Sequence, residues 1–305
     1  MNLRDLRYLV AVADQRHFGK AAESCHVSQP TLSVQIRKLE EQLGISCFER
    51  NGRKLLITPA GEAVIAEARQ ALAHADAIID IAHGFRDPLS GPFRLGVIAT
   101  LGPSIIGKLL DRLDLDAPRL QVTLREDLTD NLVPAVLSGE LDAAIIATEE
   151  APGELEEQRL FLEPFLIGYA PNHPLCKQAI ITVNDLSQGP LLLLSEGNCL
   201  RDQTLSLCDL DRSRDHPAPV LASSLETAFE VAATGRGITL VPALSASRAS
   251  PLALRDLPPA DDGLPPGRIV RLVKRRRYGR KQVMDIVASS LQQIAQDEGM
   301  PLQTP

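Results

Sequence analysis

Two of the five cysteines, Cys199 and Cys208, stand in a setting where a thiol can react. Asn198 is a residue type that favours the position before a helix, so we expect Cys199 to open a helix that continues through Leu207. A thiol at a helix N-terminus is favoured as thiolate, and the cation of Arg201 adds to that effect. A thiolate attacks a peroxide to give a sulfenic acid, which condenses with a second thiol, and Cys208 is the available one.

The spacing of this pair has a mechanical consequence. Nine helical steps of about 1.5 Å place the two α-carbons roughly 13 Å apart, whereas a disulfide needs them within about 7 Å. Helix and disulfide therefore exclude each other, and oxidation must unwind or refold the segment between Cys199 and Cys208. From the residues alone a second interpretation stays open, in which both are small packing residues of a helix and Cys208 is simply buried.

The other cysteines, Cys25, Cys47 and Cys176, lack such a setting, and we interpret them as packing residues. An odd number of cysteines in a long chain without a secretion signal does not indicate a disulfide framework. Their spacing does not suit zinc, because no close Cys/Cys or Cys/His pair is matched by a second one. We expect no metal and no cofactor.

Length and composition favour a globular protein of two or more folded units. The chain has 305 residues, with 44% hydrophobic and 23% charged content. Apolar runs such as Leu191 to Leu194 are too short to span a bilayer, and the first residues show no signal peptide. We therefore expect a cytoplasmic protein with no membrane partner.

Charge is unevenly distributed along the chain. The net charge is −7, yet residues 1–62 hold nine Lys or Arg against seven Asp or Glu, which leaves −9 for the remainder. A locally basic unit on an acidic body suits sequence-specific DNA binding by that unit better than general nucleic-acid affinity.

The amino-terminal residues predict a helix-turn-helix. Apolar residues recur at helical spacing from Leu3 to Ala13, and a second, short helix is expected around residues 20–24. Ser28 then provides an N-cap, and Pro30 fits the first turn of a third helix. Gly44 ends that helix.

The third helix has an apolar back and a mixed front. Leu32, Ile36, Leu39 and Leu43 form one buried stripe. The opposite face carries short polar, apolar and cationic groups, which can contact base edges, thymine methyls and phosphates in a major groove. A basic hairpin follows, since Asn-Gly between strand-like segments is the strongest short hairpin signal. The residues that we expect to contact DNA are Ser28, Gln29, Pro30, Thr31, Ser33, Val34, Arg37, Lys38, Arg50, Arg53 and Lys54. A small helical bundle with solvated charges is the alternative.

Residues 58–88 predict a long helix that joins two units. Thr58-Pro59 supplies a cap and a proline in the first turn. Large and small residues then alternate at heptad spacing, which suits a partner helix at close range and a dimerising role. The members of this seam are Ile65, Ala68, Leu72, Ala75, Ile79 and Ala82. A helix packed on its own body is the alternative.

Strand-like and helix-like segments alternate after Pro92, which favours an α/β unit of parallel sheets and crossover helices. We expect strands at 93–99, 120–124, 143–147, 165–170, 191–194, 238–241 and 269–273, and helices at 103–113, 132–137 and 281–296. Thr100 follows the first of these strands, where open α/β sheets place ligands, and Thr129 starts a helix. The alternative for each is a simple turn or capping hydroxyl.

The chain resembles the LysR-type transcription regulators. The amino-terminal likeness lies in Phe18…Ala21-Ala22, in Ser28-Gln29-Pro30-Thr31-Leu32-Ser33 and in Thr58-Pro59-Ala60-Gly61. Residues 191–208, Ser223 to Thr227 and Gly235 to Pro242 are similar to the peroxide-sensing members. The resemblance implies a winged helix-turn-helix at 1–62, a linker helix at 58–88 and a two-lobed, periplasmic-binding-protein-like regulatory domain at 91–305. It places lobe I at about 91–163 and 267–298, and lobe II at about 164–266.

The same resemblance implies what the regulatory domain senses. It makes Cys199 and Cys208 a redox pair that hydrogen peroxide converts to a disulfide, and it makes Thr100, Thr129, Asn198 and Arg268 the peroxide pocket. It also implies a dimer of dimers on promoter DNA, RNA polymerase as a partner, and antioxidant genes as targets. One departure is Asn198, because the family usually has a histidine before the reactive cysteine, and an amide cannot shuttle a proton.

Two rival functions remain at this level. The first is a LysR-type regulator that binds a small anionic metabolite between the lobes, with incidental cysteines. The second is a thiol peroxidase enzyme, which gives no reason for the winged unit.

Overall fold

In this computed structural model the described residues are 1–51, 54–148, 153–187, 190–208, 221–259 and 263–302. The chain divides into two units, Met1–Arg86 with Leu137–Glu140, and Asp87–Val136 with Leu141–Pro305. Across the described parts of the chain, no helix has both the length and the apolar character that crossing a membrane requires.

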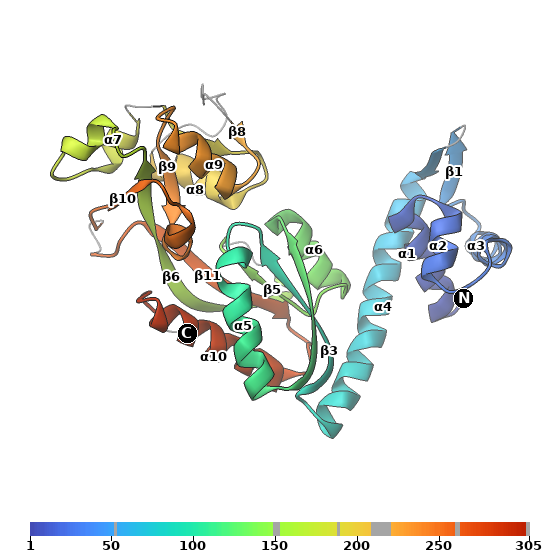
Figure 1. Ribbon diagram of the computed structural model, residues 1–305. Coiled ribbons are helices and arrows are strands. Elements are labelled where there is room, and N and C mark those ends of the chain that lie inside the picture. The colour runs from blue at the N-terminus through green and yellow to red at the C-terminus, as the bar shows by residue number, and fades with distance from the viewer. Residues whose placement is uncertain (52–53, 149–152, 188–189, 209–220, 260–262, 303–305) are drawn as a thin grey trace. The chain divides into compact units, whose positions relative to one another are not determined.

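The first unit is a three-helix arrangement followed by a hairpin and a long helix (Figure 1). Ser28 caps the third helix by accepting a hydrogen bond from the backbone N–H of Thr31, and Gly44 ends it with φ of 68°, a left-handed conformation that favours glycine. Both predicted signals are confirmed. The elements are α1 (Leu3–Gln15), α2 (Phe18–Ser24), α3 (Gln29–Leu43), β1 (Phe48–Asn51), β2 (Lys54–Ile57) and α4 (Pro59–Arg86).

The core of this unit lies between α1, α3 and the start of α4. Leu32, Ile36 and Leu39 are at most 2% exposed, which confirms the predicted apolar back of α3. On α4 the residues of the predicted seam differ in burial between the start of the helix and its later turns. Its first members, Ile65 and Ala68, are buried in their own unit's core, as the alternative interpretation proposed. Further along α4, Ile78 and Ile79 are 69% and 49% exposed.

The second unit alternates strands and helices as expected, with additional elements. The predicted strand at 165–170 is only the end of the fifteen-residue β6, and β10 has no counterpart in the sequence-based expectation. Its strands are β3 (Ser90–Ile98), β4 (Arg119–Asp127), β5 (Ala143–Ile146), β6 (Leu155–Tyr169), β7 (Leu193–Leu194), β8 (Leu221–Ala222), β9 (Thr239–Pro242), β10 (Ala253–Asp256) and β11 (Gly267–Arg275). Its helices are α5 (Gly102–Asp116), α6 (Thr129–Ser138), η1 (Pro174–Lys177), α7 (Val183–Ser187), α8 (Cys199–Leu207), α9 (Leu225–Ala233), η2 (Ala243–Arg248) and α10 (Lys281–Asp297).

The expectation of parallel sheets holds for part of the unit and is wrong for the strands β6, β9, β10 and β11. The main sheet has the order β10-β6-β11-β5-β3-β4, and β9 also pairs with β6. Within the described part of this main sheet, β3 pairs in parallel with β4 and β5, while β6, β9, β10 and β11 pair antiparallel; the separate pair β7 and β8 is also parallel. The antiparallel half arises because β11, near the end of the chain, lies between β5 and β6 and runs against both.

The long strands β6 and β11 join the two lobes of this unit (Figure 1). The first part of β6 pairs with β11, and its last residues pair with β9 and β10 instead. A second hydrophobic cluster forms around the end of β6, with side chains from α8, α9, β7 and β9. Because β6 and β11 both run from one lobe to the other, they bring residues from distant parts of the sequence to the boundary of the lobes.

We expect Gly61→Ala to destabilise the first unit. A Cβ built on Gly61 would lie 2.2 Å from the backbone oxygen of Cys47, and backbone cannot give way as a flexible side chain can. Gly107→Ala, on helix α5, is the matched control, because its added Cβ meets nothing within 4 Å. Glycine in a helix costs about 1 kcal/mol relative to alanine, so the control should keep or raise stability. Differential scanning calorimetry checks both, and an unchanged transition for Gly61→Ala would contradict the packing.

Candidate redox site and DNA-binding face

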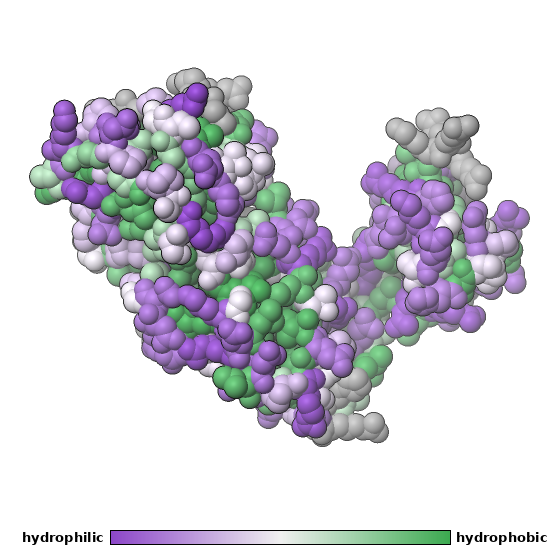
Figure 2. Space-filling model, in the orientation of Figure 1, coloured by the Kyte–Doolittle hydropathy of each residue, from purple (hydrophilic) through white to green (hydrophobic). Residues whose placement is uncertain are grey.

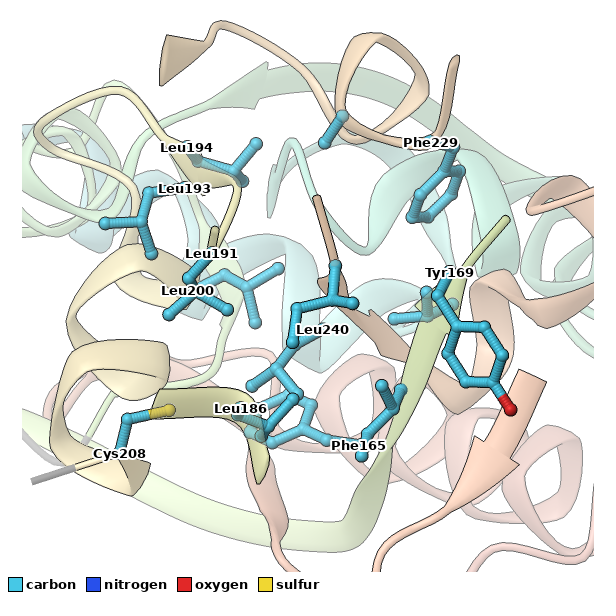
Figure 3. Close-up of a cluster of buried hydrophobic side chains, with 14 of the residues drawn as sticks. Phe165, Tyr169, Leu186, Leu191, Leu193, Leu194, Leu200, Cys208, Phe229 and Leu240 are labelled. Carbon is cyan, nitrogen blue, oxygen red and sulfur yellow. The ribbon is translucent and has the colours of Figure 1, made fainter. Parts of the chain in front are cut away.

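Helix α8 carries both cysteines of interest at opposite ends. Cys199 is its first residue and Cys208 is its C-cap, and both thiols are free. The predicted helix between them is confirmed. Cys208 is 7% exposed and belongs to the hydrophobic cluster of the second lobe, near Leu186 and Phe165 (Figure 3). Burial raises the pKa of its thiol.

The helix N-terminus favours the thiolate of Cys199 as expected, but burial has the larger effect on its pKa. Burial raises the pKa of its thiol above the ordinary value, and this outweighs the opposing effects of the Arg268 guanidinium and the backbone N–H of Leu200. Asp202 raises the pKa further. Arg201 does not supply the neighbouring positive charge, because its guanidinium is directed at the carbonyl of Leu194 at 3.5 Å. The cation that acts on Cys199 comes from β11, 69 residues along the chain.

Arg268 is held by three acceptors in the buried interior. Its Nε donates to Glu163 Oε2 at 2.8 Å, its Nη1 to Thr100 Oγ1 at 2.7 Å, and its Nη2 to the Thr100 carbonyl at 3.2 Å. Thr100 is 5% exposed and follows β3. The structure therefore brings Thr100, Arg268 and Cys199 together, which their sequence positions alone do not reveal.

The start of α6 and the end of β5 close around the same helix. A Cβ on Gly197 would lie 3.0 Å from Leu128, which places the residues just before Cys199 against the beginning of α6. Thr129 is the first residue of α6, and its buried hydroxyl has no hydrogen-bond partner among the described residues. A hydroxyl buried without a partner is costly, and it can serve a small polar ligand.

Sequence analysis missed Gln203 and Thr148. Gln203 lies four residues after Cys199, on the same side of α8, and its Nε2 donates to the carbonyl of Ala147 at 2.6 Å. Within the described chain, its Oε1 and the hydroxyl of Thr148 are buried without a partner. Helical spacing from Cys199 was the signal that could have indicated Gln203. Nothing in the sequence places Thr148 beside it.

Asn198 occupies the predicted cap position without making the capping contact. It is 8% exposed, and its side chain forms no hydrogen bond to the first turn of α8. Its amide instead donates to the carbonyl and hydroxyl oxygens of Ser195, at 3.2 and 3.3 Å.

The remaining cysteines also differ from one another: Cys47 is buried as expected, Cys25 is half-buried, and Cys176 is exposed rather than packed.

The predicted DNA-facing residues of α3 lie on one solvent-exposed face. Ser28, Gln29, Pro30, Thr31, Val34, Arg37 and Lys38 are exposed, and Ser33 is half-buried. Val34 is an apolar member of this face and is 48% exposed. The surface of the first unit that Figure 2 shows is largely hydrophilic. In the hairpin, Arg50 and Lys54 lie on β1 and β2, where the structure describes only their backbone, and Arg53 lies outside the described residues.

Two family models match the chain. Residues 3–62 match the bacterial regulatory helix-turn-helix protein of the lysR family, and residues 86–294 match the LysR substrate binding domain. The chain therefore belongs to the LysR family of transcription regulators, which bind DNA and are not enzymes. This finding excludes the thiol peroxidase interpretation.

Within that family the similar proteins are OxyR regulators. The chain is 42% identical over 248 residues to the hydrogen peroxide-inducible genes activator of Pectobacterium carotovorum, covering 81% of this chain and 82% of the relative. It is 41% identical over 245 residues to the DNA-binding transcriptional dual regulator OxyR of Escherichia coli K12, covering 80% of each.

Solved OxyR structures share the fold. Full-length OxyR of Pseudomonas aeruginosa, in a cysteine-to-aspartate variant, has a TM-score of 0.81 at 34% identity and covers 100% of this chain and 98% of its own. A hydrogen peroxide-bound cysteine-to-serine variant of Corynebacterium glutamicum OxyR has a TM-score of 0.66 at 31% identity, covering 97% and 93%. The winged unit, the linker helix and the two-lobed α/β regulatory domain follow this shared architecture.

We expect Arg268→Leu to raise the pKa of Cys199 further. Removing the cation removes the charge that favours the thiolate, so less thiolate forms at any given pH and the alkylation midpoint moves upward. Arg201→Leu is the matched control and should leave the midpoint in place, because Arg201 is directed at Leu194. Mass spectrometry of Cys199 labelling by iodoacetamide against pH measures both. A midpoint that stays or falls in Arg268→Leu would show that the guanidinium does not act on this thiol.

Proposed function

We propose that this protein is a cytoplasmic regulator that senses hydrogen peroxide through reversible formation of a Cys199–Cys208 disulfide, and that it controls antioxidant genes. The observation that carries the proposal is one helix with two thiols: the charge of Arg268, which is bonded to Thr100, acts on Cys199, while Cys208 is buried in the second lobe. The similarity to OxyR proteins supports peroxide as the signal.

The chemistry can be written with its atoms balanced. The Cys199 thiolate attacks one peroxide oxygen, the O–O bond breaks, and the departing hydroxide takes the thiol proton and leaves as water. The sulfur is oxidised to sulfenic acid and the peroxide is reduced. The thiolate of Cys208 then attacks that sulfur, the S–O bond breaks, and a second water leaves as the disulfide forms.

The site offers donors for the departing oxygen. Thr100 Oγ1 accepts from Arg268, which leaves its own O–H available to donate to a peroxide. The hydroxyl of Thr129 lacks a partner among the described residues and is a second donor. Burial raises the pKa of Cys199 and so disfavours its thiolate. Donors that stabilise the negative charge on the departing oxygen would then promote the reaction when peroxide enters the site.

The rival interpretation, an anionic metabolite between the lobes, needs a cation whose charge is not already compensated. Arg268 is the buried cation at this position, and its charge is paired with the carboxylate of Glu163. A neutral molecule as small as hydrogen peroxide suits the site better than an anion.

Formation of the disulfide requires α8 to unwind or refold. At about 1.5 Å per residue the two α-carbons lie roughly 13 Å apart, and they must approach within about 7 Å. Cys208 must also leave the hydrophobic cluster that it shares with Leu200 and Leu205. We propose that this remodelling alters subunit contacts in a dimer of dimers on promoter DNA, with RNA polymerase as a partner. The exposed Ile78 and Ile79 of α4 support pairing of the linker helices.

We expect one equivalent of hydrogen peroxide to remove two free thiols per chain and to yield a cross-linked peptide that contains Cys199 and Cys208. In Cys199→Ser we expect no rapid loss of free thiol, because the first nucleophile is absent. In Cys208→Ser the Cys199 thiol should be lost and sulfenic acid should accumulate, because the second step lacks its nucleophile. Thiol counting and peptide mapping measure this. Cys176→Ser is the control and should behave as wild type. Cys199 and Cys208 both still reduced in native wild-type protein would refute the proposal.

The exposed face of α3 is expected to bind DNA. Arg37→Ala should weaken promoter binding by about 1–3 kcal/mol if Arg37 reads a base, or lower the salt dependence by about one ion if it contacts phosphate. Arg236→Ala removes the same charge from an exposed position in the second unit and is the matched control. Fluorescence anisotropy at several salt concentrations measures both. Equal effects of the two substitutions would contradict the assignment of this face.

A further inference from the structure

Glu163 and Arg268 form a buried ion pair at the point where the two long strands cross the lobe boundary. They are directly opposite in the antiparallel register of β6 and β11, and neither side chain has any exposed surface. Glu163 Oε2 accepts from Arg268 Nε at 2.8 Å, and Oε1 accepts from the backbone N–H of Leu244 at 3.1 Å. Both carboxylate oxygens are therefore engaged.

This arrangement decides what Arg268 can offer to a ligand. A buried arginine without a carboxylate partner is a strong site for carboxylate, sulfate or phosphate, because its donors match two anionic oxygens. Here Glu163 supplies one such oxygen and compensates the charge, and Thr100 accepts two further hydrogen bonds, so three of the five N–H donors of Arg268 are engaged. The pair carries no net charge beside Cys199.

We propose that Glu163 is a positioning residue that holds Arg268 on Thr100 and compensates its positive charge beside Cys199, so that the site admits an uncharged oxidant and disfavours anions. This inference rests on the proposed peroxide-sensing function and extends it to substrate specificity. Glu163 does not contact the reacting atoms in this assignment; it acts through Arg268.

The charged groups around the thiol support this assignment. From β11 the Arg268 guanidinium acts on Cys199, and from α8 the Asp202 carboxylate does. From β6 the Glu163 carboxylate faces Arg268, and from the end of β3 the Thr100 hydroxyl does. Removing the negative charge of Glu163 leaves one uncompensated positive charge in a buried site, where charges interact more strongly than in water.

Two alkylating probes of nearly equal size test the inference, neutral iodoacetamide and anionic iodoacetate. In the reduced full-length protein, peptide mass spectrometry gives the rate at Cys199 for each probe, with the exposed Cys176 as an internal reference. In the wild type we expect no preference for iodoacetate at Cys199 relative to Cys176. In Glu163→Gln the iodoacetate-to-iodoacetamide ratio at Cys199 should rise about tenfold, and the alkylation midpoint should move to lower pH. Glu163→Asp keeps the charge and should restore most of the wild-type ratio.

The outcomes separate the inference from its alternatives. If Glu163 only joins the strands, Glu163→Gln will unfold at a lower temperature while the probe ratio and the midpoint stay at wild-type values, and the inference is overturned. If Glu163→Gln does not fold, the wild-type measurement still decides, because a preference for iodoacetate at Cys199 would show that the charge of Arg268 is not compensated. Disulfide formation by the wild type after peroxide treatment is scored separately, so failure of peroxide sensing remains distinguishable from failure of the Glu163 assignment.

Discussion

Glu163 and Arg268 are buried opposite each other on β6 and β11, and neither charge is tolerable in that interior without the other. Their pairing sets the direction of the guanidinium, and that direction brings Thr100 and the electrostatic environment of Cys199 into one site. The backbone of Leu244 is tied to the same carboxylate. The site thus depends on one ion pair that no local stretch of sequence contains.

A second constraint lies in α8, whose two ends place their thiols in different surroundings. Cys199 is half-buried where the charges of Arg268 from β11 and Asp202 from α8 act on it, whereas Cys208 is buried among leucines of the second lobe. In the reduced fold the helix is continuous, and burial raises the pKa of both thiols. A bond between these sulfurs is incompatible with the helix, so the oxidised chain must have a different structure.

Burial of Cys199 also affects how such a sensor discriminates. A thiol with a raised pKa reacts slowly with general oxidants and electrophiles, because the thiolate is the nucleophile. Reaction then depends on donors aligned with the oxidant inside the site rather than on a standing thiolate. Thr100 and Thr129 are the donors that we propose, and the amide of Asn198, which is directed at Ser195, is not among them in this arrangement.

Local pattern determined much of the architecture. The apolar stripe and caps of α3, the hairpin signal, the long helix after Thr58 and the helix between the two cysteines all follow from residues close in sequence, because caps, turns and helical periodicity are short-range effects. The likeness to LysR-type regulators indicated Thr100, Thr129 and Arg268 as site residues but not their contacts. Such local signals do not indicate which segments far apart in the sequence pair with each other. The antiparallel strands β6 and β11, the source of the cation beside Cys199, and the partly buried seam of α4 depend on which distant segments pack together, and only the tertiary structure decides that, through the burial of charge and apolar surface.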